Sequence, residues 1–209
     1  MSEAADTGGL WPDVQPEAAR RLLLAAVDSF ARLGYHATTT REIARTAGMS
    51  PAALYIHYPS KGALLFEISR TGHEDTLALV RRAAAAEQDP VARVRTLVAD
   101  FTAWHARTHT VARIVQYELH ALPQPQFEVV AELRRRIEET VREVIADGVA
   151  QGVFTVPEVR TAARALISLG VDVARWYNER SSTAPEELGR QYAELVLAML
   201  GATRGGPQP

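Results

Sequence analysis

Hydroxyl, aromatic and basic side chains gather between residues 40 and 61, and these types suit the binding of a nucleic-acid backbone. A hydroxyl, phenol, imidazole or amine can donate a hydrogen bond to a phosphate oxygen, and a positive charge adds attraction. Thr40, Tyr55, His57 and Lys61 are the candidates for phosphate contacts. Arg41 can reach either a guanine edge or a phosphate. The chemistry that these residues indicate is DNA binding.

Two small residues, Ala52 and Ala53, lie between these candidates. Alanines allow a helix to approach base edges in the major groove and to touch thymine methyl groups, whereas bulky side chains would hold the helix away. Ala52 and Ala53 are therefore expected to face the bases.

A second group with possible chemistry is the histidine pair His105 and His109, whose spacing of four can place two ligands on one helix face. A zinc protease would need a glutamate directly after the first histidine, and this segment has none. Glu118 and His120 could complete a regulatory metal site. We expect no metal and no cofactor, and histidines that lie in a pocket or at the surface.

Catalytic motifs are missing from the sequence in other respects too. There is no glycine-rich phosphate loop, and the Ser, His and Asp residues form no recognisable nucleophilic constellation. We therefore expect a protein that is not an enzyme. A helical metal-dependent enzyme is the alternative class.

Charge and composition agree with a DNA-binding segment in a cytoplasmic protein. The formal net charge is −2, yet residues 15–61 contain six basic and three acidic residues. The chain has no cysteine for a disulfide or thiolate site, and no apolar stretch of about 20 residues that could span a bilayer. Residues 1–14 are acidic and glycine-containing, unlike a secretory leader, and predict a disordered tail.

Apolar residues recur at three- and four-residue spacing nearly throughout, which predicts an all-α protein of about nine helices. Glycines, prolines and capping hydroxyls punctuate the pattern, with Thr40, Ser50 and Ser60 as expected N-caps. The expected helices are 16–33, 40–47, 51–57, 61–86, 90–106, 108–121, 125–151, 158–179 and 185–200.

The two short helices at 40–47 and 51–57 are joined through Gly48-Met49-Ser50 and have the size of a DNA-binding helix-turn-helix. Ile43 and Leu54 are expected to pack in the angle between the helices. Arg41 and Tyr55 are expected to point outwards.

The residues of this region resemble the N-terminal domain of the TetR family. The matching pattern is Phe30-x3-Gly34-Tyr35-x2-Thr38-Thr39-x3-Ile43-Ala44-x2-Ala47-Gly48-x-Ser50-x3-Leu54-Tyr55-x-His57-Tyr58-x-Ser60-Lys61-x2-Leu64. The resemblance implies a homodimeric repressor that binds a palindromic DNA operator and releases it when a ligand enters the C-terminal domain. An activator, or a repressor that needs a corepressor, would use the same parts. The other alternative is a helical domain without DNA affinity.

The resemblance also implies domain limits and site residues. The expected domains are a tail at 1–14, a DNA-binding domain at 15–62, a ligand-binding and dimerisation domain at 63–201, and a flexible tail at 202–209. Carried over by position, Pro51 joins Arg41, Ala52 and Ala53 among the base-facing residues. The predicted DNA-contacting set is Thr40, Arg41, Ser50, Pro51, Ala52, Ala53, Tyr55, His57 and Lys61.

The middle and late helices contain an aromatic and histidine-rich set, part of which could line an apolar ligand pocket. The segment at 175–178 is similar to one in TetR-type regulators of fatty-acid and steroid catabolism, which implies an acyl-CoA as the small apolar effector. A hydrophobic drug-like molecule is the alternative. The predicted pocket residues are Phe101, Trp104, His105, Arg113, Tyr117, His120, Phe127, Arg175, Trp176 and Tyr177.

The last two helices have apolar or small residues on two sides, which predicts dimerisation across a two-fold axis. One row of these apolar or small residues is expected at the dimer interface, while the other row is expected to face the domain interior and contains Leu166, Leu169, Val173 and Trp176. The predicted interface residues are Ala163, Ile167, Gly170, Ala174, Leu188, Tyr192, Leu195 and Met199. The alternative is a monomer that buries both faces internally.

Overall fold

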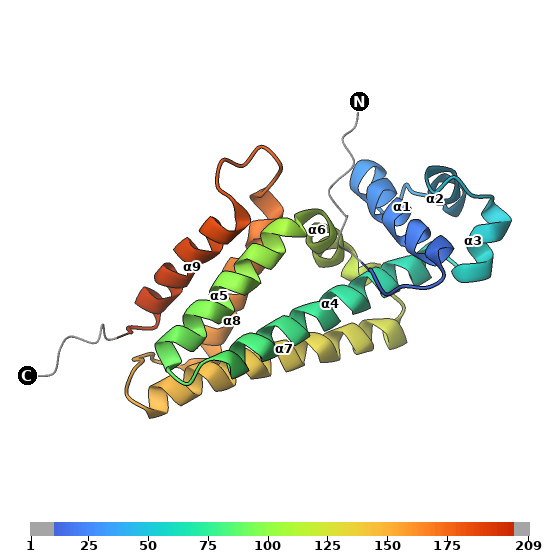
Figure 1. Cartoon of the computed structure of the whole chain (residues 1–209). Helices are drawn as coiled ribbons and strands as arrows, with labels where there is room; N and C mark the ends of the chain where they lie inside the picture. The colour runs from blue at the N-terminus through green and yellow to red at the C-terminus, as the bar shows by residue number, and fades with distance from the viewer. Residues whose placement is uncertain (1–10, 203–209) are drawn as a thin grey trace, which may run out of the picture. The chain divides into compact units, whose positions relative to one another are not determined.

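The computed structural model describes residues 11–202, and within this range the chain forms nine α-helices and one short 3-10 turn (Figure 1). The predicted all-α fold is confirmed. Within the same residues, no helix is both long and apolar enough to cross a membrane. The helices are α1 (Glu17–Leu33), α2 (Thr40–Thr46), α3 (Pro51–His57), α4 (Lys61–Ala86), α5 (Pro90–Arg107), α6 (His109–Glu118), α7 (Gln124–Ala150), α8 (Val159–Trp176) and α9 (Pro185–Met199), with the 3-10 turn at Leu119–Ala121.

The short helices begin where side-chain oxygens accept hydrogen bonds from free backbone N–H groups. Ser50 Oγ accepts from the N–H of Ala53 at 3.1 Å, as predicted. The prediction for α2 is wrong by one residue, because Thr39 is the N-cap and its Oγ1 accepts from the N–H of Glu42 at 3.2 Å. This shift frees the hydroxyl of Thr40 for another contact.

The chain divides into two compact units. The first contains the described residues up to Gly72 together with Thr110–Val130, and the second contains His73–His109 and the residues from Ala131 onward. The segment Thr110–Val130, which we expected to belong to the ligand-binding domain, is thus part of the first unit. The core of the first unit combines apolar residues of α1, α2, α3, α4 and α6.

The core of the second unit is built around α5, which packs against α8 and α9. Two glycines allow this close approach. A Cβ atom at Gly189 would lie 2.4 Å from the carbonyl oxygen of Ala99, and one at Gly170 would lie 2.5 Å from the ring of Phe101. The small residues of α8 and α9 therefore serve the interior of this unit.

Part of the expected N-terminal tail is packed against the first unit. Trp11 is only 7% exposed, and its Nε1–H donates a hydrogen bond to Thr71 Oγ1 at 2.7 Å. Val14 also packs on the core of this unit. The prediction of disorder is wrong for residues 11–14, because an indole side chain gains from burial with its N–H satisfied. Residues 1–10 and 203–209 lie outside the described part of the chain.

Candidate nucleic-acid interface

The first three helices pack on one another through a small apolar core. Ile43 of α2 and Leu54 of α3 are completely buried. The turn between α2 and α3 passes through Gly48, whose φ of +66° lies in the left-handed region that favours glycine. Arg21 of α1 donates a hydrogen bond to the carbonyl oxygen of Ala47, which ties α1 to this turn. These contacts give the helix-turn-helix a defined angle.

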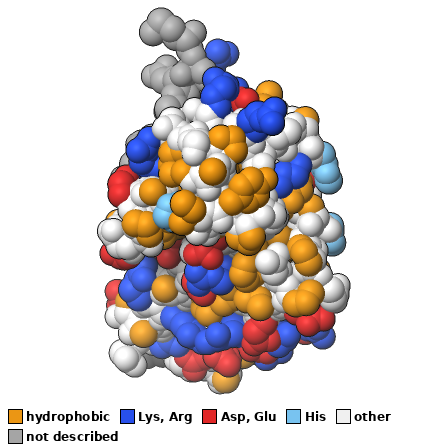
Figure 2. All heavy atoms as spheres, turned by 90° about the vertical axis from the view of Figure 1, so that its right-hand side faces the viewer, with side chains coloured by type: hydrophobic (Ala, Val, Ile, Leu, Met, Phe, Trp, Pro, Cys, Tyr) orange, Lys and Arg blue, Asp and Glu red, His pale blue; other side chains and the backbone are white. Residues whose placement is uncertain are grey.

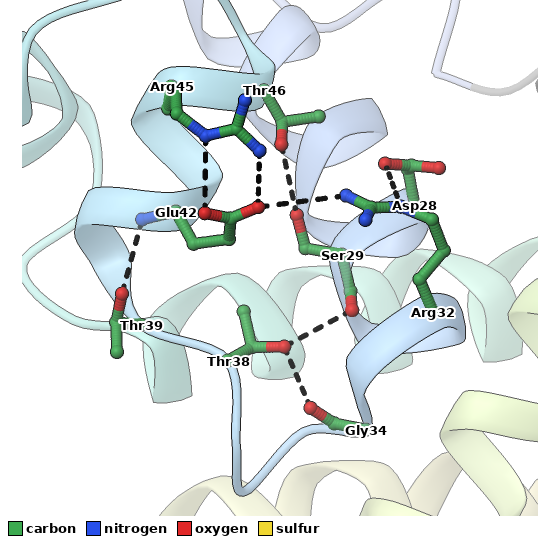
Figure 3. Close-up of polar contacts among 9 residues, drawn as sticks. All are labelled: Asp28, Ser29, Arg32, Gly34, Thr38, Thr39, Glu42, Arg45 and Thr46. Carbon is green, nitrogen blue, oxygen red and sulfur yellow. Dashed lines mark hydrogen bonds and ion pairs between the residues drawn. The ribbon is translucent and has the colours of Figure 1, made fainter.

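A network of charged groups holds α2 beside α1 (Figure 3). Glu42 accepts hydrogen bonds from Arg45 at 2.6 and 3.2 Å, and its carboxylate also lies 3.8 Å from Arg32 of α1. Arg32 is bonded in turn to Asp28 at 3.0 Å. The hydrogen bond from Arg45 holds the pKa of Glu42 below its usual range, and the charges of Arg45 and Arg32 lower it further. Glu42 therefore stays ionised.

The loop between α1 and α2 is also held by Thr38, which is buried. Its hydroxyl is 2.7 Å from the carbonyl oxygen of Gly34 and 3.2 Å from that of Ser29 (Figure 3). The start of α2 is thus joined to the end of α1 by hydrogen bonds as well as by charge.

The outward side of this unit carries most of the predicted DNA contacts. Arg41, Pro51 and Ala52 are exposed. The hydroxyl of Tyr55 lies 3.0 Å from Thr40 Oγ1, so the structure brings two predicted phosphate contacts together across α2 and α3. The members of the set that are partly covered are Thr40, Ala53, His57 and Lys61, and Ser50 is exposed.

One exposed residue of α3 was missed in the sequence. Ile56 is 79% exposed, more than any other large hydrophobic side chain in the described residues. It follows Ala52 by four positions, so helical spacing alone could have placed both on one face. Figure 2 looks at the side of the molecule on which α2 and α3 lie, and in its upper half exposed apolar side chains are flanked by Lys and Arg side chains.

Lys61, predicted to contact a phosphate, is engaged within the protein. Its Nζ donates hydrogen bonds to the carbonyl oxygens of Tyr35, His36 and Thr38 at 2.8, 3.0 and 2.9 Å. The amine also lies 4.6 Å from the centre of the Tyr35 ring. An ammonium group has three N–H donors, so all of them have partners in this structure. The geometry favours a role in holding the loop between α1 and α2.

The predicted ligand-pocket residues are divided between the two units. Arg113, Tyr117, His120 and Phe127 belong to the first, and the remaining six belong to the second. Tyr117 is 60% exposed, and Arg113 and His120 are exposed as well. These positions remain predictions.

In the second unit, the predicted pocket residues differ in burial. Phe101, His105 and Tyr177 are buried, whereas Trp176 is 41% exposed. Arg175 is exposed and donates to Asp172 at 2.7 and 2.9 Å. A cavity of 370 Å³ in this unit has other walls: Arg81, Ala84, Ala85, Arg136, Glu139, Thr140 and Glu143.

His105 lies in an apolar and aromatic environment. Its Nδ1 is 2.8 Å from the carbonyl oxygen of Phe101, and its ring centre is 4.3 Å from that of Phe101 and 4.9 Å from that of Trp104. Burial lowers the pKa of His105 to about 4, so the imidazole is neutral at physiological pH. Among residues 11–202, no group of three or more His, Asp or Glu residues is placed to hold a metal ion.

The predicted dimer interface is wrong for four residues. Ala163, Ala174 and Leu188 are each at most 6% exposed in a single protomer, and Gly170 is buried as well, so these residues offer a partner almost no surface. The small residues of α8 instead accommodate α5, as the contact between Gly170 and Phe101 shows. Conversely, Leu169 and Trp176, expected in the interior, are 43% and 41% exposed. Ile167, Tyr192, Leu195 and Met199 keep exposed surface and remain predictions.

The short helices α2 and α3 pack against each other, and α3 presents small, aromatic and apolar side chains outward. This arrangement defines a helix-turn-helix DNA-binding protein. Residues 22–68 match the family model described as bacterial regulatory proteins, tetR family, and residues 87–200 match the tetracyclin repressor-like C-terminal domain. The chain belongs to the TetR family. It is a transcriptional regulator and not an enzyme.

Individual relatives are similar to this protein over most of its chain. The HTH-type transcriptional repressor KstR2 of Rhodococcus jostii (strain RHA1) is 31% identical over 191 residues, covering 88% of this chain and 93% of the relative. The crystal structure of a bacterial regulatory protein in the tetR family from Rhodococcus RHA1 is similar with a TM-score of 0.85 and 38% identity, over 90% of this chain and 99% of that chain. The structure of the ketosteroid transcriptional regulator KstR2 of Mycobacterium tuberculosis is similar with a TM-score of 0.81 and 26% identity, over 90% and 96%.

Proposed function

We propose that this protein is a transcriptional repressor that binds a palindromic DNA operator as a homodimer and releases it when a small apolar effector binds. The exposed outer face of α3 carries this proposal, because it offers a phenol, small residues and an aliphatic side chain on a rigid helix-turn-helix. The name of KstR2 as a repressor in Rhodococcus jostii supports the sign of regulation. The DNA-binding domain is 15–62 in this proposal.

The residue roles follow from exposure and chemistry. Thr40, Tyr55 and His57 bind phosphate oxygens, and the contact between Thr40 and Tyr55 orients both hydroxyls at the junction of α2 and α3. Arg41, Pro51, Ala52 and Ala53 face the bases. Ser50 begins α3 as its cap, and Lys61 positions the loop before α2.

The dimer surface is proposed on the exposed apolar side of α8 and α9. Leu169 and Trp176 of α8 and Leu195 and Met199 of α9 are each at least 40% exposed in the protomer. Ile167 of α8 and Tyr192 of α9 also keep partly covered surface. Apolar side chains in such number on two helices suit an isologous interface. A two-fold dimer would place its recognition helices about 34 Å apart, in successive major grooves.

The effector is proposed to bind in the domain at 63–201. The description of KstR2 of Mycobacterium tuberculosis as a ketosteroid transcriptional regulator supports a steroid-like ligand for this chain. An acyl-CoA is the ligand that the similarity at residues 175–178 implies. A hydrophobic drug-like molecule is the alternative. An effector that favours a second dimer geometry would lower operator affinity by a coupling free energy of about 1–3 kcal/mol.

Selection of bound fragments from randomised DNA tests this proposal, with and without a long-chain acyl-CoA. Recovery of a palindrome supports sequence-specific binding by a dimer. Loss of binding with acyl-CoA supports the lipid effector, and indifference to it would reject that ligand while leaving the DNA function. Failure to enrich any sequence would contradict the repressor.

A further inference from the structure

Ile56 has an aliphatic side chain at a position where neither packing in the core nor helix propensity accounts for an isoleucine. It is 79% exposed, whereas Leu54, two residues earlier on α3, is completely buried. β-Branched residues are not favoured in helices, so local propensity gives no reason for an isoleucine here. Removing an isoleucine side chain from water is favourable, but the packing of the first unit does not bury Ile56.

The position of Ile56 on α3 is set by two neighbours. Ala52 lies one helical turn earlier on the same face and is exposed, so no bulky side chain stands beside Ile56 on that side. Tyr55 makes its contact with Thr40 of α2, at 3.0 Å, and is directed toward that helix. Ala52 and Ile56 therefore form the small apolar centre of the outer face of α3.

An aliphatic group can read only one feature of base edges in the major groove. Isoleucine has no hydrogen-bond donor or acceptor, and the apolar group that bases present there is the C5 methyl of thymine. We propose that Ile56, with Ala52 beside it, contacts a thymine methyl in each half-site and is a specificity-determining residue of this repressor. The inference rests on the proposed DNA-binding function and names a contact within it.

The surroundings favour DNA over a protein partner at this face. Arg41 is exposed at the start of α2, and residues 15–61 have twice as many basic as acidic residues in a chain whose net charge is −2. Lys and Arg side chains flank the exposed apolar side chains in the upper half of Figure 2. An apolar centre flanked by cationic groups matches a major groove between two phosphate backbones.

The test uses the selected operator with each thymine of one half-site, and its symmetry mate, replaced in turn by deoxyuridine, which removes only the methyl. Dissociation constants are measured by fluorescence anisotropy at one fixed salt concentration. We expect wild-type protein to lose about fourfold per half-site at one position, the value of one buried carbon group. Ile56→Ala should bind the thymine operator more weakly and lose the deoxyuridine penalty at that position only.

Val129→Ala is the matched control, because Val129 is also β-branched and exposed, at 44%, and lies outside the proposed interface. It should keep the wild-type penalty at every position. In a second arm, the thymine that Ile56 is proposed to contact is replaced by cytosine, which should weaken wild-type binding. Replacement by 5-methylcytosine should restore part of the lost affinity. Circular dichroism checks that Ile56→Ala keeps its helices.

Two binding results would overturn the inference while leaving the repressor intact. One is a wild-type protein that shows no deoxyuridine penalty, and the other is an equal penalty in Ile56→Ala. If Ile56→Ala changed the oligomeric state of the protein but left its discrimination between thymine and deoxyuridine unchanged, this face would be assigned to a protein partner. That result would also overturn the inference. Absence of any operator would contradict the proposed function itself, and the inference with it.

Discussion

The side-chain amine of Lys61 donates a hydrogen bond to the carbonyl oxygen of Tyr35 at a distance of 2.8 Å. Lys61 is the first residue of α4, and Tyr35 lies in the loop that leads into α2. Two further carbonyl oxygens of the same loop share this amine. The start of α4 and the approach to the helix-turn-helix are therefore joined through one side chain.

Lys61→Met should weaken operator binding without changing its salt dependence. Loss of three charge-assisted hydrogen bonds should also lower the free energy of unfolding by on the order of 2 kcal/mol. If Lys61 positions the loop, the slope of log K against log salt stays as in the wild type. A phosphate contact would instead reduce the slope by about 0.9 per protomer, and that result would contradict the positioning role.

Tyr55→Phe should weaken operator binding by the dimer roughly 30-fold, because one hydrogen bond of about 1 kcal/mol is lost from each of the two protomers. Tyr58→Phe is the control, since the hydroxyl of Tyr58 is 3.5 Å from the carbonyl oxygen of Ala19 inside the first unit. Electrophoretic mobility shift with the selected operator checks both variants. Equal affinities for Tyr55→Phe and wild type would remove this phenol from the interface.

Acid should destabilise the protein through His105. The pKa of this imidazole is about 4 in the folded state, against an ordinary value of 6.5. As pH falls from 6.5 to 4, the unfolded chain binds a proton that the folded chain does not, so stability falls across this window and no further below it. The two values imply a loss on the order of 3 kcal/mol.

Urea unfolding at pH 7 and pH 4 measures this loss. His105→Gln should lose less stability between pH 7 and pH 4 than the wild type does, because glutamine does not titrate. His120→Gln, which removes an exposed histidine, should follow the wild type. Parallel pH dependence of His105→Gln and wild type would show that His105 is not buried as described.

Gly170→Ala should destabilise the protomer, because the added Cβ would lie 2.5 Å from the buried ring of Phe101. Overpacking of this kind costs about 1–3 kcal/mol. Gly72→Ala is the matched control, since a Cβ there meets nothing within 4 Å and alanine favours the helix by about 1 kcal/mol. Thermal unfolding should therefore show shifts of opposite sign. A Gly170→Ala protein that is stable but monomeric would return Gly170 to the dimer interface.

Helix boundaries could be predicted because their determinants are local in sequence. Gly34, Ser50 and Pro59 end or begin helices through backbone conformation and capping that each residue type largely dictates. The exposure of Tyr55 and the burial of Leu54 follow from the same helical spacing.

The face of α8 and the role of Lys61 could not be predicted in this way. A row of small residues permits close packing against any helix, and the sequence does not say whether that helix is α5 or a partner. Only the three-dimensional contact of Gly170 with Phe101 decides. The carbonyl oxygens around Lys61 belong to residues at least 23 positions earlier, and no periodicity links them to it.

Native mass spectrometry of the wild-type protein with one selected operator duplex tests the central claim most directly, together with a footprint on the same DNA. The account predicts two protomers per duplex and two protected half-sites about one helical turn apart, related by two-fold symmetry. A single protomer on the duplex, or an asymmetric footprint of one half-site, would contradict it.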